Sequence, residues 1–526
     1  MRIFFISILC IVLSSSASAQ TPEANIDVVH YSFTLKVSDK DDSLHGVTDI
    51  RFRRLKAAGE VAFDLASVNQ EGKGMKVSGV TDDKKPLEFN HSNNKLYVTL
   101  NAGDTASKNI QVTYAGIPAD GLIISKTKYG RRSFFADNWP DRAKNWLVCV
   151  DHPADKAAVD FFIKAPAHYQ VVANGMLIEE SNVDANYKLT HYRETLPLPT
   201  KIMTVGIADF AVQYIDLLPN VRLSSWVYPE DREKGFYDFE VAKDIIPFFE
   251  NKIAPFPYRK LANVQSKTIF GGLENAGAIF YSENLITGKR TGEPTVAHEI
   301  AHQWFGDMAT EADFSHLWLS EGFATYLTIY YMEQKHGVDS ANKLLARDRQ
   351  QVIDFAARKP RPVVDSAVDS YMDLLNANSY QKGSWILHML RNELGDDVFW
   401  KGVQRYYNKF AGKNAITADL QKAMEDVSGK DLRQFFYQWL FIAGQPELKI
   451  DWKYNAGNKT VSLVIEQQQE KLFHLPMEIR VLGGNSKTLK VLINKKRFVT
   501  EIPVTFQPSA IAVDERVKLL YKSASK

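Results

Sequence analysis

The chain has 526 residues, of which 45% are hydrophobic and 24% are charged, and its formal net charge is +2 at pH 7. This length is too great for one ordinary hydrophobic core and predicts roughly two to four domains. The composition excludes a largely disordered chain, and the near-neutral charge provides no basic surface for nucleic acid, so we expect no nucleic-acid partner.

Residues 1–19 have the features of a secretory signal peptide. Arg2 supplies the positive start, an apolar run extends from Ile3 to Leu13, and Ala17-Ser18-Ala19 fits a cleavage site before Gln20. An apolar run of about 11 residues is too short to cross a bilayer, which needs about 20. We therefore expect a bacterial protein that is exported to the periplasm or secreted, with no membrane span.

Residues 20–213 are predicted to form a β-rich domain with a sandwich or saddle shape. Val28–Val37 and Leu44–Phe52 alternate apolar and polar residues, and a polar turn at Asp39–Asp42 separates them. Short alternating runs without long helical patterns are typical of packed sheets.

From residue 214 to residue 443 the predicted elements are mainly helices. Asp231–Ile253 is broadly amphipathic, and Pro247 within it is expected to kink the helix. A strand carrying Val264 is expected to follow.

The most informative stretch of this region contains the pattern H-E-x-x-H. Pro294 suits the start of a helix and Gly306 suits its end, so a helix is predicted between them. Residues four apart share one face of a helix, so His298 and His302 can present both imidazoles to one metal ion. Glu299 then lies beside that ion without being a ligand, as a general base would. The alternative is a helix with two core-facing histidines.

A third ligand is predicted from the helical pattern at Leu317–Leu327, which carries Glu321 among apolar neighbours. A catalytic zinc site uses three protein ligands and leaves a fourth position for water, and two histidines with one glutamate form such a set. Otherwise Glu321 is a first-turn carboxylate that the helix dipole favours. His316 and His336 are expected to be surface or packing residues.

Two more motifs lie before and after these along the sequence. Phe270–Gly277 reads F-G-G-L-E-N-A-G, and Ser379–Gly383 reads S-Y-Q-K-G. With H-E-x-x-H and Glu321, they resemble the zinc aminopeptidase family of aminopeptidase N, aminopeptidase B and leukotriene hydrolase, which are gluzincin metallopeptidases. Ser320 stands where that family has Asn, and Leu273 stands where it usually has Met.

The resemblance implies a zinc-dependent aminopeptidase that binds one zinc ion and acts on peptides with a free N-terminus. The ion would be held by His298, His302 and Glu321. Glu299 would be the general base, and Tyr380 would stabilise the oxyanion of the tetrahedral intermediate.

The resemblance also implies a substrate-binding segment that contains Gly271, Gly272, Leu273, Glu274 and Asn275. The carboxylate of Glu274 would hold the cationic amino terminus, so that only the first peptide bond reaches the metal. The two glycines are expected to adopt a backbone conformation closed to other residues and to let the substrate approach closely. An extended peptide would then hydrogen-bond along the segment.

Similar enzymes bring a polar or acidic residue of the N-terminal domain to the substrate amine. Asp137 and Asn138 are the candidates here, in a stretch dense in polar and aromatic residues. The alternative is a structural loop at the domain junction.

Residues 444–526 are predicted to form a small C-terminal β-sandwich, because alternating strand patterns return there. These strands are Leu448–Tyr454, Val461–Gln467, Pro476–Leu482 and Arg497–Val504. The predicted class is multidomain α+β, with a thermolysin-like α/β catalytic domain at 214–443 between the two β regions. The resemblance further suggests a short family member that lacks the large C-terminal helical domain. We expect a monomer, although the sequence does not fix the oligomeric state.

Three other functions share parts of this pattern. A metalloendopeptidase would use the same metal ligands but has no use for an amine-binding Glu274. Epoxide hydrolysis occurs in one branch of the family on the same metal. A non-enzymatic peptide-binding protein would be expected to lack a ligand, the base or the tyrosine, and none is missing. The preferred first residue and the peptide length are not fixed by the sequence.

Overall fold

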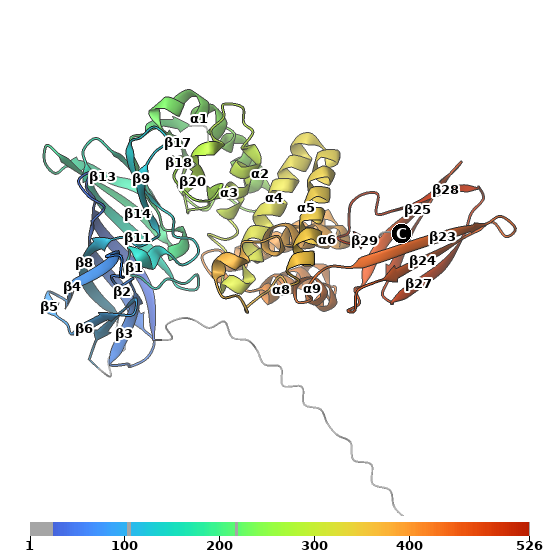
Figure 1. Ribbon diagram of the computed structural model, residues 1–526, viewed down its shortest axis with the longest axis horizontal. Helices are drawn as coiled ribbons and strands as arrows, with labels where there is room; N and C mark the ends of the chain where they lie inside the picture. The colour runs from blue at the N-terminus through green and yellow to red at the C-terminus, as the bar shows by residue number, and fades with distance from the viewer. Residues whose placement is uncertain (1–24, 102–106, 216–218, 525–526) are drawn as a thin grey trace, which may run out of the picture.

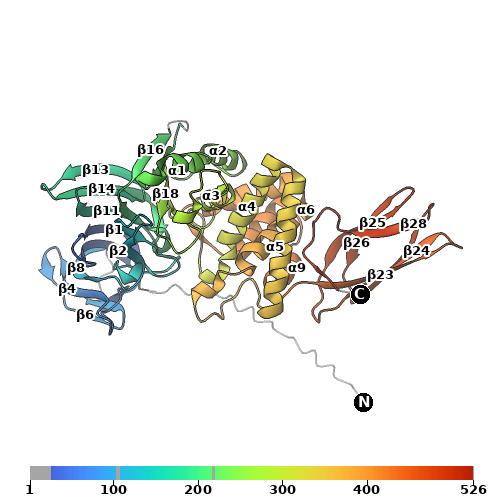
Figure 2. The same cartoon turned by 45° about the horizontal axis from the view of Figure 1, so that its top comes forward.

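The computed structural model describes residues 25–101, 107–215 and 219–524, and the expected signal segment at 1–19 lies outside them. A β-rich N-terminal region, a largely helical middle region and a C-terminal β region follow one another along the long axis (Figures 1 and 2). This is the multidomain α+β class that the sequence predicts. Within the described ranges, no helix is both long enough and apolar enough to cross a membrane.

The N-terminal region is built on an eight-stranded mixed sheet with the order β13-β14-β11-β1-β2-β8-β4-β5. In the centre, β1 pairs parallel with β11, where Phe33 lies opposite Phe161, and antiparallel with β2, where Tyr31 lies opposite Ile50. These four side chains are buried, as the alternation of apolar and polar residues predicts. The strands are β1 (Ile26–Lys36), β2 (Leu44–Arg54), β4 (Gly74–Asp82), β5 (Lys85–Pro86), β8 (Lys108–Ile117), β11 (Lys156–Pro166), β13 (Met176–Asn182) and β14 (Tyr187–Pro199).

Two smaller sheets complete this region, in the orders β3-β7-β6 and β12-β15-β10-β9. The strand β10 is important for the site, because it runs directly into Asp137, Asn138 and Trp139. The strands are β3 (Glu60–Asp64), β6 (Phe89–Ser92), β7 (Lys95–Thr99), β9 (Leu122–Lys126), β10 (Arg132–Ala136), β12 (Gln170–Ala173) and β15 (Val205–Ala208).

The middle region begins with a five-stranded sheet in the order β16-β17-β18-β20-β19. β17, β18 and β20 run parallel, and every residue of β18 is buried, as expected for a strand covered on both faces. β19 is a short antiparallel edge strand that contacts the helix α3. The elements are β16 (Ala211–Ile215), β17 (Arg222–Val227), β18 (Lys260–Ser266), β19 (Gly272–Leu273), β20 (Ala278–Ser282) and α3 (Glu293–His302).

The amphipathic pattern before β18, predicted over Asp231–Ile253 with a kink at Pro247, forms two helices, and Pro247 lies inside the second. α1 (Arg232–Phe239) and α2 (Ala242–Lys252) are separate helices, and α2 continues through Pro247. A proline removes one main-chain donor from the helix, and the burial of side chains such as Phe249 holds the helix together around it.

The helix α4 (Trp318–His336) lies at the centre of the middle region and packs against α3, α5 and α6. Its crossing with α6 is close, because a Cβ at Gly322 would lie 2.9 Å from the backbone of Gly383. A single turn of π-helix (Asn378–Lys382) leads into α6. The other helices are α5 (Val338–Arg358), α6 (Gly383–Leu394), α7 (Asp396–Phe410), α8 (Thr417–Ser428) and α9 (Arg433–Leu440), and the short strands β21 (Thr310–Glu311) and β22 (Asn414–Ala415) pair with each other.

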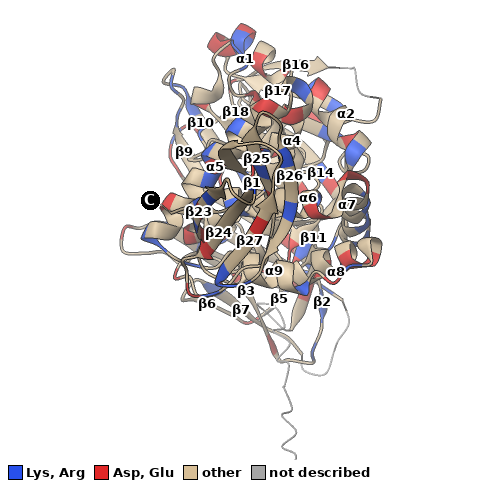
Figure 3. Cartoon of the chain, turned by 90° about the vertical axis from the view of Figure 1, so that its right-hand side faces the viewer, with Lys and Arg blue, Asp and Glu red and all other residues tan. Residues whose placement is uncertain are grey.

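The C-terminal region consists of two antiparallel sheets with the orders β27-β24-β23 and β26-β25-β28, and β29 adds a parallel edge to β23. All four strands expected from the sequence are present, and β26, β28 and β29 are additional. Acidic and basic residues are interspersed when the molecule is viewed from this end (Figure 3). The strands are β23 (Glu447–Asn455), β24 (Thr460–Gln467), β25 (Leu475–Gly483), β26 (Lys487–Ile493), β27 (Arg497–Pro503), β28 (Pro508–Val513) and β29 (Lys522–Ser523).

Candidate active site

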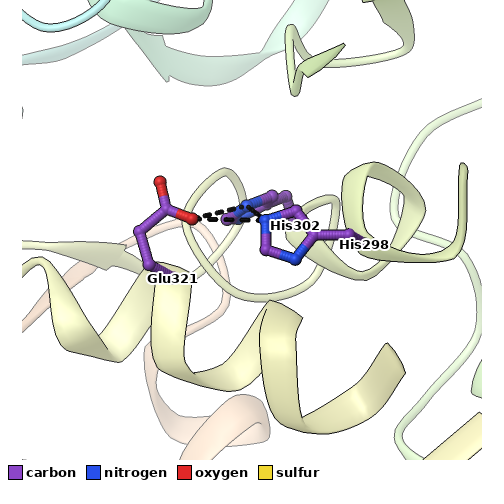
Figure 4. Close-up of side chains that lie close together, drawn as sticks. All are labelled: His298, His302 and Glu321. Carbon is purple, nitrogen blue, oxygen red and sulfur yellow. Dashed lines mark hydrogen bonds and ion pairs between the residues drawn. The ribbon is translucent and has the colours of Figure 1, made fainter. Parts of the chain in front are cut away.

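The helix α3 carries the H-E-x-x-H pattern into the interior. Pro294 lies in its first turn, and the helix ends at His302 rather than continuing towards Gly306. Gly306 has φ 115° and forms part of the turn that follows. Because Ile300 and its apolar neighbours anchor one face in the core, the imidazoles of His298 and His302 project from α3 towards α4 (Figure 4).

The side chains of His298, His302 and Glu321 converge on one point (Figure 4). The two Nε2 atoms are 3.1 Å apart, and Oε2 of Glu321 lies 3.2 Å from Nε2 of His302 and 3.3 Å from Nε2 of His298. Ligands at the usual zinc distances of about 2.0–2.1 Å are roughly 3.3 Å apart in a tetrahedron. Both the chemistry and the spacing of this donor set therefore fit zinc.

The second imidazole nitrogen of His302 is held by the protein. Its Nδ1 lies 3.1 Å from the carbonyl oxygen of Phe305 and 3.1 Å from Oγ of Ser320. A proton on Nδ1 that is donated to the carbonyl leaves the Nε2 lone pair free for a metal. A Cβ at Gly306 would lie 2.2 Å from Oγ of Ser320, so the absence of a side chain there makes room for this contact.

Glu299 is buried beside the cluster and lies against the substrate-binding segment. A Cβ at Gly272 would be 2.3 Å from Oε1 of Glu299. Neither Gly271 nor Gly272 has a positive φ, so the expectation of an unusual backbone at these glycines is wrong. Glycine is needed at position 272 because a side chain there would collide with the carboxylate of Glu299. Burial raises the pKa of Glu299, and a bound cation would act in the opposite direction.

Glu274 follows the edge strand β19 and is 5% exposed. Its Oε1 has no hydrogen-bond partner among the described residues. The amide of Gln303 fixes the backbone around it, because Nε2 donates to the carbonyl oxygen of Glu274 at 2.8 Å and Oε1 accepts from N–H of Gly277 at 2.8 Å. Nε2 of Gln303 also donates to Asp307 at 3.0 Å.

Tyr380 lies in the π-helical turn, a local irregularity that is often found at functional sites. Its ring is nearly parallel to that of His298, with 6.0 Å between the ring centroids. Burial and the nearby Glu321 raise the pKa of Tyr380 well above its ordinary value. The phenol therefore stays protonated and can donate a hydrogen bond at neutral pH.

One cavity of about 490 Å³ contains most of the residues that the sequence singles out. The sequence-predicted residues that line it are His298, Glu299, His302, Glu321, Gly271, Gly272, Leu273, Glu274 and Tyr380. Asn275 does not line it; its side chain is 1% exposed and has no hydrogen-bond partner among the described residues.

The two candidates of the N-terminal region lie behind the cavity wall rather than in it. The amide of Asn138 donates to the carbonyl oxygens of Thr200 and Met203 and accepts from the indole of Trp146, so its hydrogen bonds are all within the interior.

The carboxylate of Asp137 accepts hydrogen bonds from Oγ1 of Thr268 and N–H of Ile269, and it pairs with Arg142. It therefore supports the backbone that leads into Gly271. The residue of this stretch that lines the cavity is Trp139.

Other residues that line the cavity or support its wall had no sequence signal or only a weak one. Gln303 directly follows the second histidine of the motif, which could have pointed to it. Trp139 lies beside the two residues that the sequence singled out. The wall formed by α4 and α5 carries no recognisable motif, and it consists of Thr325, Thr328, Ile329, Leu344, Arg347 and Asp348.

H-E-x-x-H on one helix with a glutamate on the next, beside a mixed five-stranded sheet, is the arrangement of the gluzincin class of metallopeptidases. Residues 237–439 match the Peptidase family M1 domain, and residues 28–202 match the Peptidase M1 N-terminal domain. The chain belongs to peptidase family M1, as the resemblance in its motifs predicts.

Curated relatives of the chain are named aminopeptidases. The chain is 26% identical over 495 residues to probable aminopeptidase 2 of Sulfurisphaera tokodaii, covering 86% of this chain and 62% of that protein. It is 29% identical over 412 residues to aminopeptidase A of Gloydius brevicauda, covering 75% and 43%. It is 25% identical over 480 residues to leucyl aminopeptidase of Saccharolobus solfataricus, covering 83% and 57%.

The fold is also that of a solved structure, the crystal structure of Legionella pneumophila aminopeptidase A in complex with aspartic acid. The TM-score is 0.83 at 18% identity, and the match covers 97% of this chain and 60% of that chain. At this identity the likeness shows the fold. The chain thus spans between 43% and 62% of the lengths of the relatives described here.

Proposed function

We propose that the protein is a zinc-dependent aminopeptidase that removes the N-terminal residue from peptides. The observation that carries this proposal is the placement of Glu274 in the same cavity as His298, His302 and Glu321. Membership of peptidase family M1 and the names of the curated relatives support it.

Zinc would be held by Nε2 of His298, Nε2 of His302 and the carboxylate of Glu321. When bound, zinc lowers the pKa of a coordinated water and polarises the scissile carbonyl. The hydrogen bonds from His302 to Phe305 and Ser320 hold one imidazole in the tautomer that binding needs.

Glu299 is the general base of the proposed reaction. Its carboxylate takes the proton of the attacking water and later delivers it to the nitrogen of the leaving amine. The phenol of Tyr380 donates a hydrogen bond to the carbonyl oxygen as negative charge develops there. Both side chains line the cavity beside the metal ligands.

Glu274 determines which peptide bond is cut. Its Oε1, which has no partner among the described residues, accepts a hydrogen bond from the substrate ammonium group. Because this anchor lies at a fixed position relative to the metal ligands, only the bond after the first residue reaches the metal. A buried carboxylate oxygen without a hydrogen-bond partner is costly, and the substrate cation would compensate for that cost.

A paired assay tests the proposal. Two peptides of the same sequence, one with a free and one with an acetylated N-terminus, are incubated with the zinc-loaded protein, with and without a chelator. We expect stepwise removal of N-terminal residues from the free peptide only, and loss of this activity on chelation. Internal cleavage of the acetylated peptide would instead identify an endopeptidase and remove the role given to Glu274.

We also propose that the protein is exported, on the basis of the signal-like sequence at residues 1–19. The expected observation is a processed protein in the periplasmic or extracellular fraction whose first residue is Gln20. An unprocessed chain in the cytosolic fraction would contradict export.

A further inference from the structure

The cavity has two chemically different ends. At one end, Trp139 and Leu273 belong to a buried apolar cluster, and Phe270 and Leu375 pack against that cluster. The rings of Trp139 and Phe270 meet edge to face with 6.3 Å between their centroids. All four side chains line the cavity. We call this the aromatic end.

The other end lies between α4 and α5. Thr325 and Ile329 follow Glu321 at intervals of one helical turn and line the cavity. At about 1.5 Å per residue, Ile329 lies roughly 12 Å along α4 from Glu321. Leu344 and Arg347 of α5 also line this arm. We call this the helical end.

If the proposed function is correct, the order of groups along a peptide determines which part of the substrate occupies each end of the cavity. The first Cα of the substrate lies between its ammonium group and its scissile carbonyl, so the first side chain branches off between Glu274 and the metal. Leu273, the last residue of β19, directly precedes Glu274, which places the aromatic end beside the amine anchor. The residues after the scissile bond continue past Tyr380 and Glu321 into the helical end.

Among the described residues that line the cavity, none at the aromatic end is free to pair with a charged first side chain. Of the described residues around the cavity, Arg347 is the one with a permanent positive charge; it lies at the helical end, paired with Asp348 at 3.1 Å. Arg142 lies over the ring of Phe270 but pairs with Asp137 and does not line the cavity.

Glu274 itself is engaged by the substrate amine in the proposed complex, so it cannot also neutralise a basic side chain. Trp139 itself adds an indole N–H, which is buried and has no acceptor among the described residues. One neutral donor does not compensate for the desolvation of a charge. A large uncharged side chain, in contrast, gains from contact with the aromatic rings.

We propose that Trp139, Phe270, Leu273 and Leu375 form the subsite for the substrate's first side chain, and that this subsite selects large uncharged residues over acidic and basic ones. This inference rests on the proposed aminopeptidase function and goes further by naming the class of substrate.

The first test is a panel of tripeptides assayed with the zinc-loaded protein. The first residue is varied among Phe, Leu, Glu and Lys with the rest held as Ala, and in a second panel the second residue is varied instead. We expect kcat/KM for Phe or Leu in the first position to exceed that for Glu or Lys by about 100-fold or more. Equal rates for charged and aromatic first residues would overturn the inference.

A matched pair of variants tests which end is which. Leu375→Arg places a cation at the aromatic end, and Leu344→Arg places the same cation at the helical end; both leucines are only partly buried. We expect Leu375→Arg to raise the ratio of Glu to Phe in the first position by about 100-fold. Leu344→Arg should leave that ratio unchanged and alter preference after the scissile bond.

A reversal of these two results would overturn the assignment of the ends. If Leu375→Arg does not fold, Trp139→Phe provides a milder change: the smaller ring should raise the rate for Trp relative to Leu in the first position by roughly fivefold. An unchanged ratio would count against Trp139 as a wall of this subsite. Failure of every free-amino peptide to react would overturn the aminopeptidase function itself, whereas cleavage with a different first-residue preference would overturn the subsite alone.

Discussion

The side-chain amide of Gln303 donates a hydrogen bond to the main-chain carbonyl oxygen of Glu274 at 2.8 Å. Gln303 directly follows the second histidine of α3, so this bond ties the end of the helix that carries two proposed metal ligands to the proposed amine anchor. The same amide accepts from Gly277, and the segment is thus held at two points. In the proposed mechanism, the distance between metal and anchor determines where a peptide is cut, and the side chain of Gln303 helps to fix that distance.

We predict that Gln303→Met weakens binding of the substrate amine while leaving zinc in place. Without the amide, the carbonyl of Glu274 and the N–H of Gly277 lose their buried partner, and each loss costs about 1–3 kcal/mol. We expect kcat/KM on free-amino peptides to fall by about 10- to 100-fold, mainly through KM, and the melting temperature to fall. Gln350→Met is the control, because its exposed amide donates to Asp354 and, among the described residues, makes no contact with the site. Loss of zinc from the Gln303 variant would contradict a positioning role.

Glu299→Gln tests the general base. The amide has nearly the same shape as the carboxylate but cannot accept the proton of water, so we expect kcat to fall by about 10²- to 10⁴-fold. Metal analysis should show one zinc ion per chain before and after the substitution. A variant that retains activity, or one that loses its zinc, would remove Glu299 from the role of base.

The parts of the site that the sequence could predict are those determined by local periodicity. The spacing of His298 and His302 fixes their common face once a helix is assumed, and Glu321 lies on the next helix. The aromatic end could not be predicted in this way. Which residue after β10 faces the cavity depends on how that strand packs against the middle region, and the sequence singled out Asp137 and Asn138 where Trp139 lines the cavity.

Local periodicity also fails to predict the role of Gly272 and some strands of the fold. The need for Gly272 arises from its contact with Glu299, a residue of another element, and not from its own backbone angles. In the C-terminal region, the alternating strand β25 was evident from the sequence. The strand β28 is mostly half-buried, so its pattern of apolar and polar residues carries little information.

Ser320→Ala is expected to weaken zinc binding. Oγ of Ser320 lies 3.1 Å from Nδ1 of His302 and helps to orient the imidazole. Loss of such a neighbour typically lowers metal affinity about 10- to 100-fold. Competition with a coloured chelator measures this directly, without an activity assay. Ser384→Ala is the matched control, because Oγ of Ser384 is buried but has no hydrogen-bond partner among the described residues. Equal affinities in both variants would contradict the role of Ser320.

The stability of the protein should decrease in mild acid because of His388 on α6. Burial lowers the pKa of His388 to about 4, and its Nε2 lies 2.9 Å from the carbonyl oxygen of Val517. The unfolded chain, with an ordinary pKa near 6.5, binds the proton first as pH falls. The contribution of neutral His388 to the free energy of unfolding is therefore complete above about pH 6.5. It is lost progressively as the pH falls to about 4, by about 3 kcal/mol in total.

Thermal unfolding between pH 7 and pH 4 measures this effect. His388→Gln keeps a hydrogen-bond donor but does not titrate, so its melting temperature should fall less than that of the wild type over this range. The neighbouring cations Arg391, Arg349 and Lys518 also lower the pKa of His388 and remain charged throughout. Parallel pH profiles for the two proteins would show that other groups determine the acid sensitivity.

Lys201 and Glu311 form a buried ion pair with Nζ and Oε1 2.5 Å apart, and both side chains are at most 1% exposed. Lys201→Met leaves the carboxylate of Glu311 buried without its partner, which should destabilise the protein by about 3–5 kcal/mol. The double variant Lys201→Met/Glu311→Met removes both charges and should recover most of that loss. Lys422→Met, which breaks an exposed pair with Asp426, should leave stability nearly unchanged, because solvent screens such a pair. Denaturant unfolding compares the four proteins, and a double variant as unstable as Lys201→Met would show that the packing of Lys201 matters more than its charge.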